Sequence, residues 1–211
     1  MEIRPILSTL SRHKTAAALI VLEIALSCAI ICNALFIVSQ RIDAMQLASG
    51  IDDSHLIEIG LSGIGEQVDA DARTAEDLAS LRGIPGVESV TIVNQLPFQG
   101  GSWNTSLAIS PEPDAQSING AQYMVGENAV KTLGLKLIAG RDFNADEYQS
   151  SDVLEKVEDL GKLKAPAILT EAMAKQFFPD GNAVGKTLYM ANIPVTVVGV
   201  AQTLLRPNMQ D

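Results

Sequence analysis

Gly185-Lys186-Thr187 is the stretch of this 211-residue sequence that most suggests nucleotide binding, because a phosphate-binding loop ends in the same residue types. Such a loop also needs a glycine five positions before its second glycine, so that successive backbone N–H groups can surround the phosphates. Asp180 occupies that position, and Gly181 lies one residue too close. A helix-like segment precedes the motif and a strand-like segment follows it, which is the reverse of the order in a phosphate-binding loop. We therefore expect a structural turn and no nucleotide site.

Histidines and cysteines are too few for a conventional catalytic or metal site. His13 and His55 are the two histidines, whereas a serine triad or a zinc site needs more convergent groups. Cys28 and Cys32 are four residues apart and would share a helix face. That spacing permits a metal pair, but it is more typical of small residues that pack against other helices. We expect no catalytic residue, no metal ligand and no cofactor in this chain.

Residues 15–39 form an apolar run with one charged residue, Glu23. As a helix this run would span about 37 Å at ~1.5 Å per residue, and a bilayer core requires about 20 apolar residues. The run is too long for the apolar part of a signal peptide, and apolar sequence continues after Cys28, unlike at a lipoprotein cysteine. The rest of the chain is not apolar enough to surround such a helix in a soluble core. We predict a transmembrane helix over residues 15–39.

Glu23 lies inside this predicted span. An ionised carboxylate in the apolar part of a bilayer costs several kcal/mol unless it is protonated or paired. The residue therefore indicates that the helix contacts other helices. Two roles are open: a neutral Glu23 that hydrogen-bonds to a neighbouring helix, or a Glu23 that takes part in coupling or transport.

The distribution of charge predicts the orientation. Arg4, Arg12 and Lys14 precede the apolar run, and basic residues favour the cytoplasmic side of a membrane. Residues 1–14 are then cytoplasmic, and residues 41–211 form an extracytoplasmic domain that contacts the bilayer through its anchor. This domain carries 12 basic and 23 acidic residues, so it would repel nucleic acid and anionic lipid headgroups.

Apolar periodicity and turn residues predict interspersed helices and strands in residues 41–211, which indicates a layered α+β domain. The membrane helix is expected to continue to a stop at Gly50. Strands are predicted at 55–61, 86–94, 104–110, 121–126, 135–140, 165–170, 186–190 and 193–202. Helices are predicted at 68–83, 127–134 and 171–178, and loops at 111–120 and, with a helical piece, at 144–164.

Residues 99–104 read QGGSWN and form a glycine-rich loop with one large aromatic ring. Gly100 and Gly101 leave the backbone free, and Trp103 adds an apolar surface with one N–H donor. We predict that Gln99, Gly100, Gly101 and Trp103 contact a partner or substrate. The alternative is that Trp103 packs under the loop as part of the core.

Three stretches resemble segments of MacB-like and FtsX-like ABC transporter permeases. They are GVESVTIVNQLPFQGG, LGLKLIAGRDFNADE, and PAILTEAMAKQFFPDGNAVGKTLYM with the VTVVGV that follows it. Their order and spacing are similar to those of the family, and the apolar helix lies where the family has its first transmembrane helix. Gly185-Lys186 would then be the family's turn between a helix and a strand. Thr170 stands where the family usually has asparagine, which we interpret as a local turn change.

The resemblance implies a layered mixed α/β domain of the MacB periplasmic core type, in a permease that relays cytoplasmic ATP hydrolysis to the periplasm. It implies an ABC ATPase on a separate subunit or domain, a second permease protomer, a bacterial inner membrane and, as a further candidate partner, a periplasmic adaptor protein. Family members continue with more of the domain and three further transmembrane helices. We therefore expect residues 41–211 to be an incomplete domain without those C-terminal helices. The alternative is a single-pass anchored binding domain without a transport role.

Overall fold

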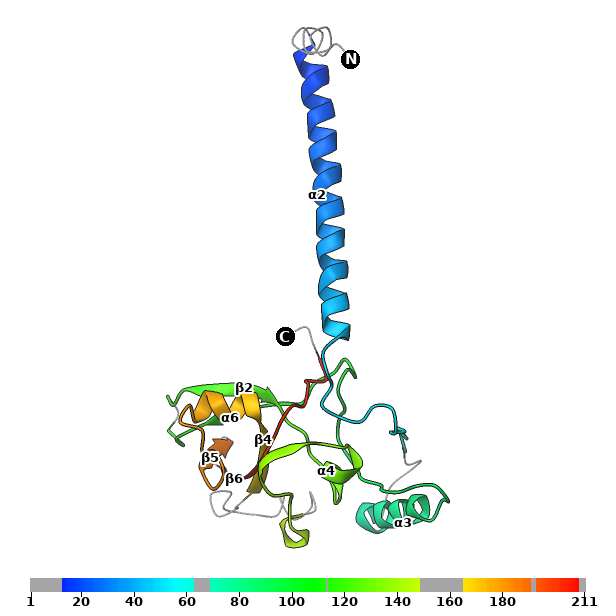
Figure 1. The fold of residues 1–211 in the computed structure, drawn as a ribbon, viewed down its shortest axis with the longest axis vertical. Coiled ribbons are helices and arrows are strands. Elements are labelled where there is room, and N and C mark those ends of the chain that lie inside the picture. The colour runs from blue at the N-terminus through cyan, green and yellow to red at the C-terminus, as the bar shows by residue number, and fades with distance from the viewer. Residues whose placement is uncertain (1–12, 63–68, 113, 149–164, 191–192, 209–211) are drawn as a thin grey trace. The chain divides into compact units, whose positions relative to one another are not determined.

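The computed structural model describes residues 13–62, 69–112, 114–148, 165–190 and 193–208. The chain divides into two units, residues 1–47 and residues 48–211. The described part of the first unit is mostly one helix, and the second unit is a mixed α/β domain (Figure 1). This architecture confirms the predicted fold class of an N-terminal apolar helix followed by a mixed α/β domain.

Helix α2, Lys14–Met45, is one continuous helix of 32 residues. Residues 14–43 are long and apolar enough to cross a membrane, and none of the window that defines this span is buried. A helix satisfies its own backbone hydrogen bonds, so an apolar one is suited to lipid on all sides. The helix ends at Met45 and not at Gly50 as predicted, because residues 48–50 already belong to the domain.

The domain is built on a six-stranded sheet with β6, Ile193–Ala201, at its centre. β6 pairs with β5, Thr187–Met190, and β3, Leu137–Gly140, in antiparallel fashion. It also pairs in parallel with β4, Ala165–Thr170. The sheet continues from β5 into β1, Asn104–Ala108, and β2, Ser117–Ala121, which form an antiparallel pair.

The core lies where helix α6, Glu171–Phe177, packs on this sheet. Leu188 and Val197 are fully buried, and Phe177 of α6 is 6 % exposed. α6 follows β4 directly, and the Thr170 hydroxyl accepts a hydrogen bond from the Met173 backbone N–H. Thr170 thus serves as the helix N-cap, a role that asparagine also fills well.

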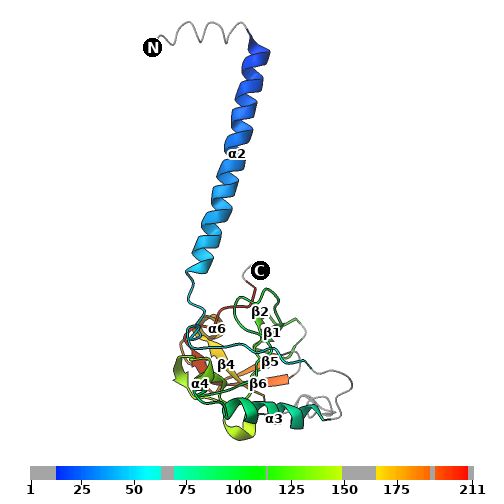
Figure 2. The same ribbon diagram turned by 90° about the vertical axis from the view of Figure 1, so that its right-hand side faces the viewer.

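Shorter helices complete the described part of the domain. α3, Ala70–Arg82, begins at the N-cap Asp69 and stops at Gly83, as its sequence predicts. It lies at the end of the domain away from β1 and β2 (Figures 1 and 2). α4 spans Ala129–Thr132, and a 3₁₀ turn, η1, spans Ala145–Glu147.

Three of the predicted strands and one predicted loop are wrong. Of the predicted strand at 121–126, Ala121 ends β2 and Val125 makes an isolated bridge, while the other residues are in no strand. Residues 55–61 and 86–94 form no ladder with other described residues, apart from one bridge between Val93 and Val125. Their alternating apolar residues suit a strand, but a strand also needs a neighbouring strand and a surface to pack on. Residues 55–61 lack both among the described residues, and Ile57 is 87 % exposed. Residues 117–120 were expected in a loop and form most of β2, because β1 supplies the pairing that their sequence does not suggest. Most of the predicted 144–164 loop lies outside the described residues.

Candidate functional site

A loop over residues 95–103 is held in place by the buried side chain of Gln95, which is 4 % exposed. Its Nε2 donates to the carbonyl oxygens of Trp103 at 3.2 Å and Gln122 at 2.8 Å. Its Oε1 accepts from the backbone N–H of Trp103 at 2.8 Å. One amide thus joins both ends of the loop to the segment after β2. Sequence reasoning missed Gln95, because a glutamine before a Leu-Pro turn carries no pattern that indicates burial.

The backbone of this loop is strained at Phe98, where φ is 67°. Positive φ is rare for a bulky residue and persists where surrounding contacts fix it. On one side, the Gln99 side chain accepts from the backbone N–H of Leu96 at 2.8 Å. On the other, the backbone N–H of Gly100 donates to the Pro207 carbonyl at 3.2 Å. These contacts give the loop a defined shape.

Trp103 is 64 % exposed and Phe98 is 50 % exposed. This exposure contradicts the alternative that Trp103 packs as part of the core. Gln95 binds the backbone of Trp103 and not its ring. Gln99, Gly100 and Gly101 are exposed on the same loop, and Gln99 Nε2 also donates to Glu58 Oε1. The structure thus brings together all four residues predicted as contacts. Their role in binding stays a prediction.

Residues 49–53 form a tight junction where the domain begins. Ser49 is 5 % exposed; its Oγ donates to the two carboxylate oxygens of Asp53 at 2.9 and 3.0 Å. Its carbonyl accepts from the backbone N–H of Leu205 at 2.9 Å. Gly50 has φ of 88°, and a Cβ atom there would lie 2.2 Å from the Thr203 carbonyl oxygen. The first residues of the domain are thus pinned to the segment that follows the central strand β6.

His55 forms an exposed ion pair and not a catalytic triad. Its Nδ1 lies 2.9 Å from Asp52 Oδ2 and 3.0 Å from Ser54 Oγ. A serine triad needs the carboxylate and the serine on opposite ring nitrogens, whereas both partners contact the same nitrogen here. The hydrogen bond to Asp52, together with its charge, raises the pKa of His55, and the same bond lowers the pKa of Asp52. This cluster is a surface ion pair near the start of the domain.

The Gly185-Lys186 turn uses its amides within the protein. The backbone N–H of Gly185 donates to the Val197 carbonyl at 2.7 Å, and that of Lys186 donates to the Ala183 carbonyl at 3.1 Å. In a phosphate-binding loop such amides point at the anion. The turn leads instead into β5 and fixes it against β6.

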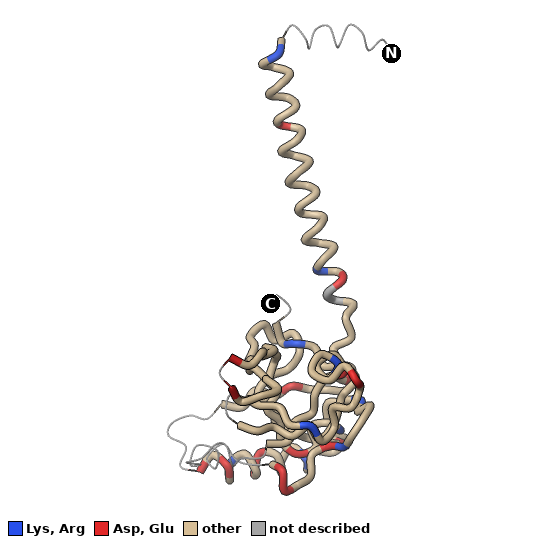
Figure 3. The backbone as a smooth tube through the Cα atoms, turned by 90° about the vertical axis from the view of Figure 1, so that its left-hand side faces the viewer, with Lys and Arg blue, Asp and Glu red and all other residues tan. Residues whose placement is uncertain are grey.

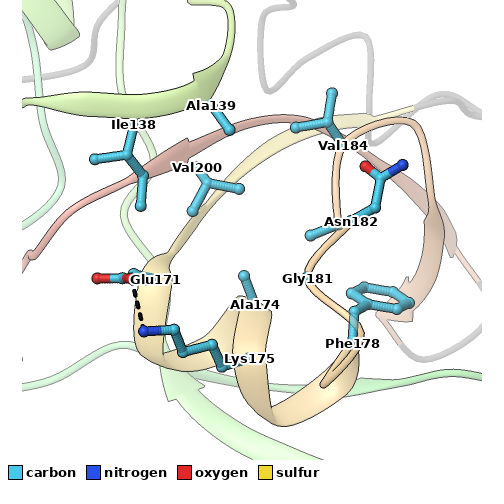
Figure 4. A pocket seen from close by; sticks show the side chains of 11 residues that line it. Ile138, Ala139, Glu171, Ala174, Lys175, Phe178, Gly181, Asn182, Val184 and Val200 are labelled. Atoms are coloured by element: carbon cyan, nitrogen blue, oxygen red, sulfur yellow. Dashed lines mark ion pairs between the residues drawn. The ribbon is translucent and has the colours of Figure 1, made fainter.

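A cavity of about 140 Å³ lies beside this turn (Figure 4). The Glu171 carboxylate and the Lys175 ammonium form an ion pair at 2.7 Å on one of its walls. Small-molecule sites usually have volumes of about 300–1,000 Å³. This cavity is therefore too small to enclose a typical ligand. Its lining residues are Ile138, Ala139, Glu171, Ala174, Lys175, Phe178, Gly181, Asn182, Ala183, Val184 and Val200.

The polar residues of α2 face outward from an isolated helix. Glu23, Cys28 and Cys32 are all exposed, and both cysteines are free thiols. Within the described residues, no group of three or more His, Cys, Asp or Glu side chains is arranged to hold a metal ion. The structure therefore adds no partner for Glu23 and brings no third metal ligand to the cysteine pair.

A family model of the MacB-like periplasmic core domain matches residues 15–211. The chain belongs to this family. The match begins inside α2 and continues to Asp211, so it includes the apolar helix as well as the domain. It confirms the predicted relationship to ABC transporter permeases.

One curated relative is the macrolide export ATP-binding/permease protein MacB of Vibrio parahaemolyticus serotype O3:K6 (strain RIMD 2210633). It is 26 % identical over 131 residues, which are 61 % of this chain and 16 % of the relative. The chain thus spans a small part of the length of that protein. Its name combines ATP binding and permease in one protein.

Two solved structures are similar over part of the domain. The periplasmic region of MacB from Actinobacillus actinomycetemcomitans has 25 % identity and a TM-score of 0.39, covering 60 % of this chain and 49 % of that one. The extracellular domain of the ABC-type transporter YknZ from Gram-positive bacteria has 20 % identity and a TM-score of 0.39, covering 62 % and 58 %.

The family-like sequence at Gly140-Arg141-Asp142-Phe143 has a structural role. Gly140 has φ of 73°, and a Cβ atom there would lie 2.2 Å from the Val198 carbonyl oxygen of β6. Arg141 forms two parallel hydrogen bonds with Glu147, each 2.7 Å long. These bonds, with a further one from the Asn144 backbone, lower the pKa of Glu147 to about 2. The motif closes the turn after β3.

Proposed function

We propose that this chain is the N-terminal membrane helix and periplasmic domain of an ABC-type permease, which relays cytoplasmic ATP hydrolysis to the periplasm. The observation that carries this proposal is the single family match across α2 and the domain. One family model covers both the apolar helix and the periplasmic core domain, which fits a protein that couples the two sides of a membrane.

The junction at residues 49–53 supports a mechanical role. Only Gln46 and Leu47 separate the end of α2 from the domain unit. Buried Ser49 is bound to Asp53 and to Leu205, and Gly50 fits closely under Thr203. Thr203 and Leu205 follow β6, which pairs with three other strands. We infer that a displacement of the helix end would reach the centre of the sheet through this short connection.

We propose the inner membrane of a bacterium as the location, with residues 1–14 inside and residues 41–211 outside. Arg4, Arg12 and Lys14 support this orientation through the preference of basic residues for the cytoplasmic side. Glu23 supports an assembly of several helices, because its carboxyl group needs a protonated or paired state in lipid.

We further propose that ATP is hydrolysed by an ABC ATPase that works with this chain and lies on the cytoplasmic side. The amides of Gly185 and Lys186 are already bound within the protein, which argues against ATP binding at that turn. A second permease protomer completes the assembly, and a periplasmic adaptor is a further candidate partner.

Purification of the chain from native membranes in a mild detergent tests this function. A permease should be recovered with an ABC ATPase and a second copy of itself, and the assembly should hydrolyse ATP. Lys186→Ala is the control and should leave that hydrolysis unchanged, because Lys186 lies in a structural turn. Recovery of the chain as a monomer without any ATPase would support the alternative of an anchored binding domain. Loss of hydrolysis in Lys186→Ala would contradict the role given to the turn.

A further inference from the structure

The outer edge of strand β2 carries a row of unpaired backbone groups. β2 pairs with β1 alone among the described strands, so one of its two edges has no neighbouring strand (Figure 1). Beyond β2 the chain continues to bond on the side of β1. The Gln122 N–H donates to the Trp103 carbonyl at 2.8 Å, and the Gly126 N–H donates to the Ile92 carbonyl at 2.9 Å. Even-numbered residues from 118 to 126 thus direct their backbone groups inward.

Odd-numbered residues of this segment direct their backbone groups outward, because successive residues of a strand alternate between its two edges. Within the described residues, the outward N–H and C=O groups find no hydrogen-bond partner. We call these odd-numbered residues the β2 edge: Ser117, Asn119, Ala121, Tyr123 and Val125.

The β2 edge also lacks the features that usually prevent further pairing. Proteins commonly protect an exposed strand edge with charged residues or proline. Residues 115–126 contain neither, although the domain is acidic, and they are drawn in tan in Figure 3, where acidic residues are red. By contrast, β4 pairs with β6 alone and contains Pro166, which removes one backbone donor. Glu112 and Asp114 lie in the turn between β1 and β2, before the edge begins.

The β2 edge is complementary to itself. A two-fold axis at Ala121 would place Ala121 opposite the same residue of a second copy and Asn119 opposite the partner's Tyr123. All of these residues direct their backbone groups outward, so each opposed pair could exchange two hydrogen bonds. Between them, half-buried Ile118 would lie opposite the partner's Met124. Met124 is 46 % exposed, and this pairing would give it an apolar neighbour.

We propose that the β2 edge pairs in antiparallel fashion with the β2 edge of a second copy of this chain, which joins two domains into one continuous sheet. This inference rests on the second permease protomer of the proposed function. Two short strands bury less surface than a stable interface needs, so we expect pairing where a shared membrane raises the effective concentration of the two copies.

Cysteine cross-linking of the full chain in native membranes tests this pairing. Cys28 and Cys32 are first replaced by serine, and Ala121→Cys is then introduced. Opposed residues of such a pair have Cα atoms about 5.5 Å apart, which is within the range that a disulfide spans. Mild oxidation should convert most of the chain into a disulfide-linked homodimer. The matched control is Ala167→Cys on β4, also a half-buried alanine in a strand with one partner, and it should stay monomeric.

A charge swap separates loss of pairing from loss of folding. Ala121→Lys places two like charges opposite each other, so energy transfer between labelled copies should indicate association about fivefold weaker than in the native chain. Ala121→Glu should have the same effect for the same reason. A mixture of the two variants should recover the association, because opposite charges then face each other. A mixture that associates no better than either variant alone would contradict the pairing.

Other outcomes of the cross-linking would also overturn this inference. Recovery of a second copy and an ABC ATPase without a cross-link at position 121 would reject the edge contact and leave the proposed function intact. Equal cross-linking at positions 121 and 167 would indicate random collision. A cross-link from position 121 to a different protein would assign the edge to a strand of that protein. Recovery of the chain as a monomer would contradict both this inference and the proposed function.

Discussion

Helix α2 and strand β6 are both strongly apolar, yet α2 is exposed and β6 is buried. No described side chain of α2 is buried, whereas Val197 of β6 is fully buried and Val195 and Val200 are each 5 % exposed. β6 needs three partner strands to satisfy its backbone, while α2 satisfies its backbone alone. An apolar segment that is complete in hydrogen bonds but uncovered requires an apolar solvent. The structure thus surrounds β6 with protein, and the contrast supports the proposal that α2 lies in lipid.

A charge placed in β6 tests the protein half of this comparison and should have the largest effect. Val197→Asp buries an unpaired carboxylate and should lower the free energy of unfolding of the domain by more than about 4 kcal/mol. Denaturant unfolding followed by Trp103 fluorescence measures the change. Ile57→Asp is the control, because Ile57 is 87 % exposed and its replacement should cost within about 0.5 kcal/mol. Equal losses in both variants would contradict the assignment of β6 as the core strand.

Strand β6 and strand β2 also show what sequence reasoning can and cannot find. The run from Ile193 to Ala201 is predictable, because a short apolar stretch rich in β-branched residues is typical of a buried strand. β2 contains Asn119 and Gly120, which disfavour strands, and forms because β1 lies beside it. Pairing is a tertiary property, so the sequence overpredicted residues 55–61 and missed residues 117–120.

The candidate site was likewise predictable from the sequence only in part. The sequence predicts that Gln99, Gly100, Gly101 and Trp103 lie on one loop, because two successive glycines favour a loop over a helix or strand. The same pattern does not decide whether Trp103 is buried. The structure shows an exposed ring, and Gln95, which lies before the glycine-rich motif, binds the backbone of Trp103.

The junction between α2 and the domain can be tested with two glycines. Gly50 and Gly86 have φ of 88° and 91°, so an alanine at either position should cost about 1–2 kcal/mol of backbone strain. A Cβ atom at Gly86 meets no heavy atom within 4 Å, whereas one at Gly50 lies 2.2 Å from the Thr203 carbonyl oxygen. Gly50→Ala should therefore destabilise the domain more than Gly86→Ala in denaturant unfolding. Equal destabilisation would show that the junction is not tightly packed.

Glu23 tests the lipid half of the comparison, with a smaller expected effect. Glu23→Leu should weaken association between copies of the helix by about 1 kcal/mol, the size of a hydrogen bond between membrane helices. Glu23→Gln keeps the shape and the hydrogen bonds, so association should be little changed. Energy transfer between labelled full-length chains in bilayers measures both variants. If neither differs from the native chain, Glu23 has no role in assembly.

The smallest expected effect is at His55, on the exposed side of the junction. Its pKa should lie above the ordinary value of 6.5, because Asp52 accepts a hydrogen bond from the ring and attracts its charge. While Asp52 is ionised, the ion pair therefore adds stability that is complete below pH 6.5 and is lost as the pH rises through the raised pKa of His55. NMR titration of the ring protons measures this pKa. In Asp52→Asn it should move back toward 6.5, and an unchanged value would rule out Asp52 as the cause.

The orientation of α2 is the most direct test of the central claim that this chain links the cytoplasm to a periplasmic domain. Alkaline phosphatase, which is active only outside the cytoplasm, and green fluorescent protein, which fluoresces in the cytoplasm, are fused in separate experiments after Asp211. The account predicts active phosphatase and a dark fluorescent fusion, both in the membrane fraction and expressed at equal levels. A bright fluorescent fusion with inactive phosphatase would place residues 41–211 in the cytoplasm and contradict the account.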